Sequence, residues 1–132
     1  MQLDRCLAAI ARQSVAPTEV LVVDNAPRGD AARRVALARG ARYLVEPVPG
    51  LGRARNAGAR AATGDVLLYT DDDAEPETTW VGRTLDEFAD PAVVAVAGRI
   101  APLDDGSAAA QEQARAAGFP LGGDERFALD QR

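Results

Sequence analysis

The chain contains no histidine and no lysine, and these absences limit the chemistry it can perform. All fifteen basic residues in the 132-residue sequence are arginines, a skew that is typical of a GC-rich bacterial genome. Without histidine there is no imidazole base or imidazole metal ligand, and without lysine there is no amine nucleophile. Acid–base or metal chemistry must therefore fall to aspartate, glutamate, tyrosine or the single cysteine, Cys6.

Cysteine and long apolar runs are also scarce. Cys6 has no partner for an internal disulfide, which fits a reducing cytosol, and its apolar helical position predicts a packing role. No apolar run approaches the roughly 20 residues of a membrane span, and no signal peptide opens the chain. The net charge of −5 disfavours nucleic-acid binding. We therefore expect a soluble, cytoplasmic protein.

Helical and strand patterns alternate along the chain. The apolar stripe of Leu3, Cys6, Leu7 and Ile10 predicts a helix over residues 2–13. Further helices are expected over residues 30–39, 53–63 and 79–88, and strands over residues 19–24, 41–47, 65–70 and 92–102. Alternation of this kind predicts an α/β domain with a largely parallel sheet.

Single residues mark the ends of these elements and their buried positions. Asp30 is predicted to cap the second helix, and Gly40 is predicted to end it. In the last of the four helices, Trp80, Leu85 and Phe88 are the expected buried residues.

Aspartates follow two of the predicted strands. Asp24 ends the first apolar run, and Asp71, Asp72 and Asp73 (the aspartate cluster) follow the third. Because ligands collect at the carboxyl ends of parallel strands, we expect these carboxylates to share one functional edge. On an extended segment, side chains at i and i+2 point the same way. One carboxylate of the cluster can then hold a metal while the other contacts a sugar; a solvated acidic turn is the alternative.

The residue types at this edge favour a particular kind of metal. Carboxylate oxygens without histidine or cysteine partners suit a hard cation such as Mg²⁺ or Mn²⁺. Mg²⁺ usually takes one or two carboxylates and completes its coordination with substrate phosphates and water. The sequence therefore suggests a metal that is bound together with a phosphate-bearing substrate.

Several motifs occur in a fixed order over about residues 3 to 103. "RCLAAIARQ" leads into "EVLVVDNAPRGD", followed by "PGLGRARNAGARAATGD" and then "VLLYTDDDAEPETTW". In this order the motifs resemble those of the family 2 glycosyltransferases, which are inverting enzymes with the GT-A fold. The resemblance implies a Rossmann-like three-layer sandwich with a mostly parallel sheet.

The resemblance also implies roles for the aspartates. Asp24 would hydrogen-bond the nucleotide base, usually uracil, and Asp71 would face the ribose or the sugar. Asp73 would ligate a divalent metal, Mn²⁺ or Mg²⁺, that bridges the diphosphate, and Asp72 takes the variable middle place of an Asp-x-Asp motif. The implied donor is a nucleotide-diphospho-sugar, most often a UDP-sugar.

Residues around the third helix complete the implied donor site. Arg53 and Arg55 are candidates for contact with the base or the phosphates, since the planar guanidinium suits phosphate. Asn56 is expected to fix the preceding loop through backbone hydrogen bonds, and Trp80 is expected in the core. Three glycines are assigned to turn shape and close packing: Gly50, Gly52 and Gly58.

The mechanism that the resemblance implies is direct displacement with inversion. The metal and basic side chains stabilise charge on the departing nucleoside diphosphate, and a carboxylate base deprotonates the acceptor hydroxyl. Family acceptors include glycan chains and lipid-linked intermediates. Such acceptors would place the enzyme at the inner face of the membrane as a peripheral protein.

The chain departs from the family pattern at both ends. The family opens with a strand ending in Pro-x-Tyr-Asn or similar, whereas this sequence begins at the following helix. The catalytic base of the family follows the point where this chain stops, and neither Asp124 nor Glu125 lies in a motif that makes it a base. We therefore expect residues 1–103 to form a donor-binding domain and residues 104–132 a partial acceptor-side segment.

Other classes of protein remain as alternatives. A response-regulator receiver phosphorylated on Asp71 would need a lysine at a later strand end, and the chain has none. A dinucleotide-binding reading of "GLGRARNAG" fails because Arg55 stands where the third glycine should be. A non-catalytic binding fragment that keeps the fold without turnover is the third alternative.

Overall fold

The structure, a computed structural model, describes residues 2–98. By its contacts the chain divides into two compact units, Met1–Asp86 and Glu87–Arg132. The segment expected at residues 104–132, with Asp124 and Glu125, lies outside the described residues, as does the end of the strand predicted at 92–102.

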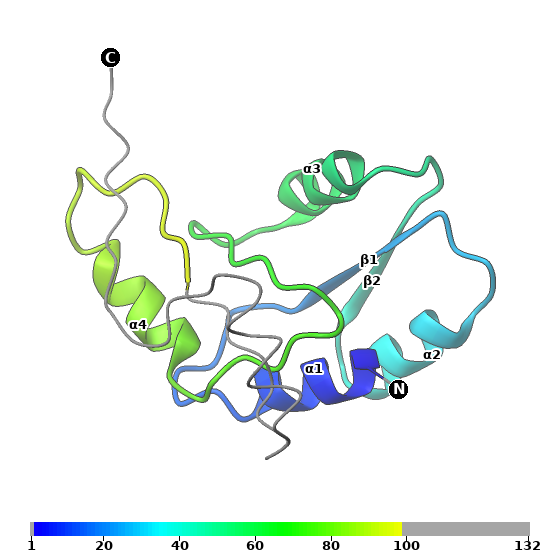
Figure 1. Cartoon of the computed structure of the whole chain (residues 1–132), viewed down its shortest axis with the longest axis horizontal. Helices are drawn as coiled ribbons and strands as arrows, with labels where there is room; N and C mark the ends of the chain where they lie inside the picture. Colours follow the sequence, from blue (N-terminus) through cyan, green and yellow to red (C-terminus); the bar gives the residue numbers. More distant parts are fainter. Residues whose placement is uncertain (1, 99–132) are drawn as a thin grey trace, which may run out of the picture. The chain divides into compact units, whose positions relative to one another are not determined.

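The first unit contains a short parallel sheet with helices around it (Figure 1). In chain order the elements are α1 (Gln2–Ala11), β1 (Leu21–Asn25), α2 (Ala31–Ala38), β2 (Arg42–Glu46), α3 (Leu51–Ala61) and α4 (Trp80–Glu87). Strands β1 and β2 pair in parallel, with Leu21 opposite Arg42 and Asn25 opposite Glu46. The predicted α/β class, the first two strands and their parallel pairing are confirmed.

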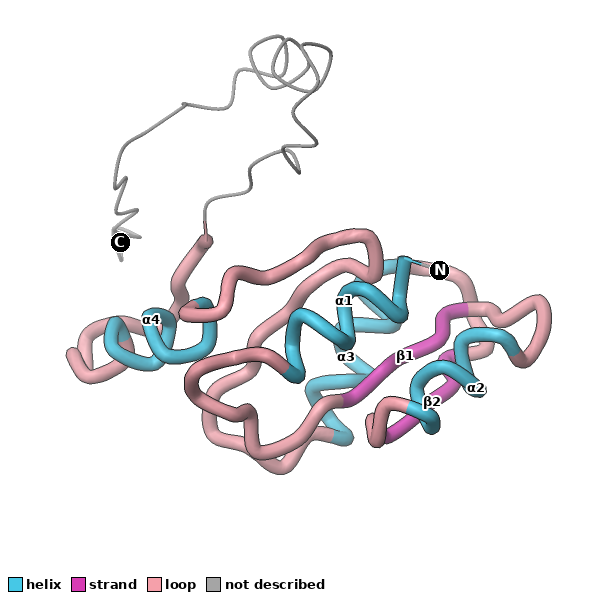
Figure 2. Tube along the Cα trace, turned by 90° about the horizontal axis from the view of Figure 1, so that it is seen from below, coloured by secondary structure: helices cyan, strands magenta, loops and turns pink. Residues whose placement is uncertain are grey.

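Helices cover both faces of this sheet. On one face, Leu3 and Leu7 of α1 form a buried core with Ala36 of α2, against which Val22 and Tyr43 of the strands pack. Figure 2 views the strands from the side of α2. On the other face lies α3, whose buried Gly58 approaches the side chain of Val23. Neighbouring residues of a strand point to opposite faces, so α3 and the α1–α2 pair form separate layers.

Helix α2 ends as the sequence predicts. Gly40 has a positive φ of 74°, a conformation that is costly for residues with a Cβ atom. The amide of Ala41 donates to the carbonyl of Ala36 over 2.9 Å, and the amide of Gly40 donates to Leu37 over 3.1 Å. This is the Schellman arrangement. Asp30 makes no side-chain capping bond to α2, so its predicted role is wrong; it pairs with Arg34 one turn later.

The strand predicted at residues 65–70 is not formed. These residues have no strand assignment, and β2 is the only strand that pairs with β1 among residues 2–98. A strand requires a hydrogen-bonded neighbour, and this segment has none in the described part of the chain. Leu67 and Tyr69 are 43% and 50% exposed. Residues 92–98 of the predicted fourth strand are likewise unpaired, and Val94 is exposed.

The predicted buried positions are confirmed in α1 but not in α4. Leu3, Cys6 and Leu7 of the α1 stripe are buried and Ile10 is half-buried. In and beside α4, Trp80 and Phe88 are half-buried, but Leu85 is exposed, and the buried residue of that helix is Val81. None of the helices within residues 2–98 has the length and apolar character needed to cross a membrane.

Candidate functional site

Asp24 lies near the carboxyl end of β1 and is fixed by Tyr43 of β2. The Tyr43 hydroxyl donates to Oδ2 of Asp24 over 2.7 Å. The register pairs Val22 with Tyr43 and Asp24 with Val45, so Asp24 and Tyr43 are diagonal neighbours on one face of the sheet. The hydrogen bond to the Asp24 carboxylate raises the pKa of Tyr43 above its ordinary 10.0. Oδ1 of Asp24 receives no hydrogen bond from the residues that the structure describes.

Asn25, the next residue, connects the end of β1 to the β2–α3 loop (residues 47–50). Its side-chain amide donates to the carbonyl of Glu46 over 3.2 Å and to that of Val48 over 2.8 Å. Its Oδ1 accepts from the amide of Gly50 over 2.7 Å. The carboxyl end of the sheet is therefore tied to the start of α3.

Arg53 and Arg55 lie at the start of α3. Both are exposed, and neither guanidinium has an ion-pair or hydrogen-bond partner within residues 2–98. Gly50 precedes the helix with a φ of 145°, which confirms its predicted turn role. The two cationic side chains are therefore available to an anionic ligand near Asn25.

Two of the predictions for this helix are wrong. Asn56 is exposed and its side chain makes no hydrogen bond within the described residues; the loop is held by Asn25 instead, because Asn25 lies opposite Glu46 where that loop begins. A Cβ atom added at Gly52 would meet nothing within 4 Å, so this glycine serves neither a turn nor close packing. At Gly58 the same atom would lie 3.3 Å from Val23, which confirms the predicted packing role.

The aspartate cluster forms a turn rather than an extended strand end. The amide of Ala74 donates to the carbonyl of Asp71 over 3.2 Å, which closes a four-residue turn. The expectation that Asp71 and Asp73 point the same way by strand alternation is therefore wrong. The three side chains are exposed, and their carboxylates have no hydrogen-bond or ion-pair partner in the part of the chain described.

The segment that follows the turn lies alongside α1 and runs in the same direction (Figure 1). The Cys6 thiol donates to the carbonyl of Asp71 over 3.5 Å. Arg5 pairs with Glu75 at 3.2 Å, and Gln13 donates to the carbonyl of Glu77 over 2.7 Å. The Cys6 contact attaches the aspartate cluster to α1, and the other two contacts attach the residues that follow the cluster.

Cys6 packs as predicted, and its environment makes it unreactive. It is 3% exposed. Burial raises the pKa of the Cys6 thiol, and the negative charges of Asp72, Asp73 and Glu75 raise it further. A thiol with a raised pKa is a poor nucleophile at neutral pH, so we assign Cys6 to the core.

The structure brings together some of the predicted site residues. Asp24 and the start of α3 are joined through Asn25. No hydrogen bond joins Asp24 to the aspartate cluster within residues 2–98, because residues 65–70 do not pair with β1. Tyr43 and Asn25 were missed by the sequence reasoning. The only signal for them was their position: Asn25 follows Asp24 at a strand end, and Tyr43 lies in the neighbouring strand.

The aspartate cluster offers carboxylate oxygens but no complete metal site in the part of the chain that the structure describes. Its oxygen donors match the preference of Mg²⁺ and Mn²⁺. No group of three or more acidic, cysteine or histidine side chains within residues 2–98 is arranged to hold a metal ion. The exposed carboxylates therefore supply at most part of the coordination of such a cation.

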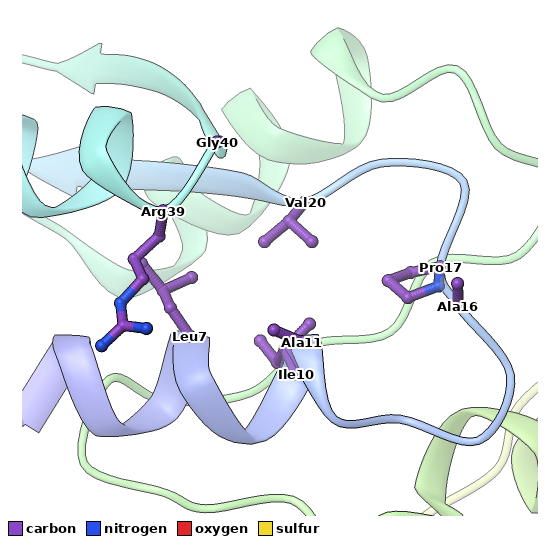
Figure 3. A pocket seen from close by; sticks show the side chains of 8 residues that line it. All are labelled: Leu7, Ile10, Ala11, Ala16, Pro17, Val20, Arg39 and Gly40. Atoms are coloured by element: carbon purple, nitrogen blue, oxygen red, sulfur yellow. The ribbon is translucent and has the colours of Figure 1, made fainter.

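A pocket of about 230 Å³ lies away from these residues (Figure 3). Its lining comes from the end of α1, the residues before β1 and the end of α2: Leu7, Ile10, Ala11, Ala16, Pro17, Val20, Arg39 and Gly40. These positions place it at the amino edge of the parallel strands. None of the predicted site residues lines it.

The chain matches the glycosyl transferase family 2 over residues 2–128. The ordered motifs, the parallel strands and the carboxylates lie within these residues. The chain therefore belongs to this family, which implies the GT-A fold. Among curated proteins it is similar to the pre-mycofactocin glycosyltransferases of Mycobacterium tuberculosis strains CDC 1551 / Oshkosh and ATCC 25618 / H37Rv. Each is 42% identical over 53 residues.

The similarity to these relatives covers a limited part of both proteins. It spans 40% of this chain and 11% of the length of each relative. No solved structure was found to match the chain.

Proposed function

We propose that this chain provides the nucleotide-sugar-binding part of a metal-dependent glycosyltransferase that transfers a sugar from a UDP-sugar with inversion. The observation that carries the proposal is the family match over residues 2–128. The acceptor is a glycan or a lipid-linked intermediate, and the latter would bring the protein to the inner face of the membrane as a peripheral partner.

The base side of the donor site is assigned to Asp24. Its Oδ2 accepts from Tyr43, which leaves Oδ1 available to accept an N–H from a base. Uracil offers such a donor at its N3 position. A carboxylate held by one hydrogen bond is oriented before the ligand arrives, so less conformational entropy is lost on binding.

The phosphate side is assigned to Arg53, Arg55 and the aspartate cluster. The two exposed guanidinium groups supply paired donors for phosphate oxygens. Asp73 is the proposed metal ligand, and Asp71 the proposed contact to the ribose or the sugar. When bound, Mn²⁺ or Mg²⁺ would neutralise charge on the departing diphosphate.

Titration calorimetry of the full chain with UDP and with ADP, each with and without Mn²⁺, tests this proposal. We expect UDP to bind more tightly than ADP and to require Mn²⁺. The substitution Asp24→Asn should reduce the preference for UDP. The control Asp30→Asn removes another exposed aspartate, which pairs with Arg34, and should leave UDP binding unchanged.

A transfer assay separates the catalytic and non-catalytic forms of the proposal. Metal-dependent UDP binding without turnover of a UDP-sugar would support the non-catalytic form, in which this chain binds the donor but does not supply a catalytic base. Ordinary turnover by these 132 residues would show that the base is present in this chain. Failure to bind UDP in the presence of Mn²⁺ would overturn the proposed donor site.

A further inference from the structure

The side chain of Asn25 uses all of its hydrogen-bonding groups within the protein. An asparagine side chain has two N–H donors and one carbonyl oxygen. In Asn25 the donors go to the carbonyls of Glu46 and Val48, and the oxygen accepts from the amide of Gly50. Although Asn25 follows Asp24 directly, neither N–H is left to bind a ligand.

The backbone around Asn25 reinforces this connection. Ala26 has a positive φ of 53°, which is unusual for a residue with a Cβ atom. This conformation turns the chain out of β1, and the amide of Ala26 donates to the carbonyl of Glu46 over 2.8 Å. Asn25 and Ala26 therefore both donate to the carbonyl of Glu46, the last residue of β2 before the β2–α3 loop.

The connection reaches the residue that precedes α3. Gly50 receives the Asn25 bond through its amide, and its carbonyl accepts from the amide of Ala54 over 3.1 Å in the first turn of the helix. Arg53 and Arg55 project from the same turns. A shift of the loop would therefore move both arginines relative to Asp24, which remains bonded to Tyr43.

We propose that Asn25 is a positioning residue that sets the distance between the base-binding Asp24 and the phosphate-binding start of α3 without contacting the donor. This inference rests on the proposed function, since it assigns ligands to Asp24, Arg53 and Arg55. Its structural part, the attachment of the β2–α3 loop to β1, can be tested without any ligand.

Gln13 provides a matched control. Its side-chain amide also joins two segments through three hydrogen bonds: to the carbonyls of Ala9 and Glu77 and from the amide of Val81. It lies beyond the end of α1, and it is not among the proposed ligand-binding residues. Gln13→Ala and Asn25→Ala therefore remove similar bonds, but only Asn25→Ala removes bonds to the β2–α3 loop, whereas Gln13 binds Glu77, four residues beyond the aspartate cluster.

The first measurement is amide hydrogen exchange of the full chain. In Asn25→Ala we expect faster exchange at residues 48–54, while Gln13→Ala should leave these amides unchanged. If the loop and the start of α3 keep wild-type protection in Asn25→Ala, the attachment by Asn25 is disproved whatever the ligand is.

The second measurement compares the affinities for UDP and uridine in the presence of Mn²⁺. We expect Asn25→Ala to weaken UDP binding by about tenfold, equivalent to about 1.4 kcal/mol, and to weaken uridine binding much less. General destabilisation would affect both ligands equally. Arg53→Ala should then cost less UDP affinity in the Asn25→Ala background than in the wild type, because the arginine is already displaced.

The outcomes separate this inference from the proposed function. Equal losses for UDP and uridine, or a loss in Gln13→Ala as large as in Asn25→Ala, would overturn the positioning role while leaving the UDP site standing. A wild-type chain that binds neither ligand would overturn the proposed function, and the positioning role with it.

Discussion

The hydroxyl group of Tyr43 donates a hydrogen bond of 2.7 Å to the carboxylate of Asp24. The two residues lie on neighbouring parallel strands, so the sheet itself holds the carboxylate in place. This relationship gives Asp24 one occupied and one available oxygen at the carboxyl end of β1. It also makes Tyr43 a reporter of the charge on Asp24.

We predict that Asp24→Asn lowers the pKa of Tyr43 toward its ordinary 10.0, because the charged acceptor that raises it is removed. The chain has two tyrosines, so the substitution Tyr69→Phe leaves Tyr43 as the sole phenol. Spectrophotometric titration in this background measures the shift. An unchanged titration after Asp24→Asn would show that the bond does not form in solution.

Removal of the hydroxyl group tests the same bond from the other side. Tyr43→Phe should lower the free energy of unfolding by about 1 kcal/mol, the usual value of one intramolecular hydrogen bond. It should also weaken UDP binding, since Asp24 is no longer oriented. Urea unfolding and calorimetry measure the two effects. Wild-type UDP affinity in Tyr43→Phe would show that the bond does not prepare Asp24 for the base.

Glu19 predicts a pH dependence of stability. It accepts hydrogen bonds from the backbone amide and the hydroxyl of Thr63 and from Arg42, and these bonds lower the pKa of Glu19 to about 2. The folded chain then binds fewer protons than the unfolded chain between about pH 4.5, the ordinary value, and about pH 2. The contribution of Glu19 is present above this range and is lost as the pH falls through it.

We therefore expect the free energy of unfolding to decrease as the pH is lowered across this range. The decrease should be less steep in Glu19→Gln. Glutamine keeps an acceptor for Thr63 but does not titrate. Urea unfolding at neutral pH and at several acidic pH values measures the slopes. Asp4, whose pKa is lowered by its bonds to Arg39, contributes equally to both proteins. Identical slopes in wild type and Glu19→Gln would contradict the assignment.

Local sequence patterns were sufficient to predict the helices and the first two strands. The stripe of Leu3, Cys6 and Leu7 and the run that forms β1 are local signals, and both are confirmed. The strand predicted at residues 65–70 has an equally apolar sequence but no hydrogen-bonded neighbour among the described residues. Strand formation depends on partners that are distant in sequence, and a local pattern does not contain them.

The site shows the same limit. Residue type and the order of the motifs were sufficient to predict Asp24 and the aspartate cluster as candidate site residues. The bonds of Asp24 to Tyr43 and of Asn25 to the β2–α3 loop depend on the register of β1 against β2. A shift of one residue in this register would turn these side chains to other neighbours. The sequence alone therefore did not reveal Tyr43 or Asn25.

Two glycines of α3 predict different outcomes for the same substitution. Gly52→Ala should stabilise the chain by at most about 0.5 kcal/mol, the lower end of the range for a helix interior, because Gly52 is the second residue of α3 and its added Cβ atom would meet nothing within 4 Å. Gly58→Ala should not give this gain, since its Cβ atom would lie 3.3 Å from Val23. Urea unfolding measures both. Equal stabilisation by the two substitutions would contradict the close approach of α3 to β1.

The central claim, that the aspartate cluster binds a divalent metal together with the nucleotide, is tested most directly by electron paramagnetic resonance of Mn²⁺. The decrease in the free Mn²⁺ signal on addition of the chain measures binding, with and without UDP. We expect the wild type to take up Mn²⁺ strongly only when UDP is present. Asp73→Asn should abolish this uptake, whereas Asp72→Asn should retain most of it. Undiminished UDP-dependent uptake by Asp73→Asn would contradict the claim.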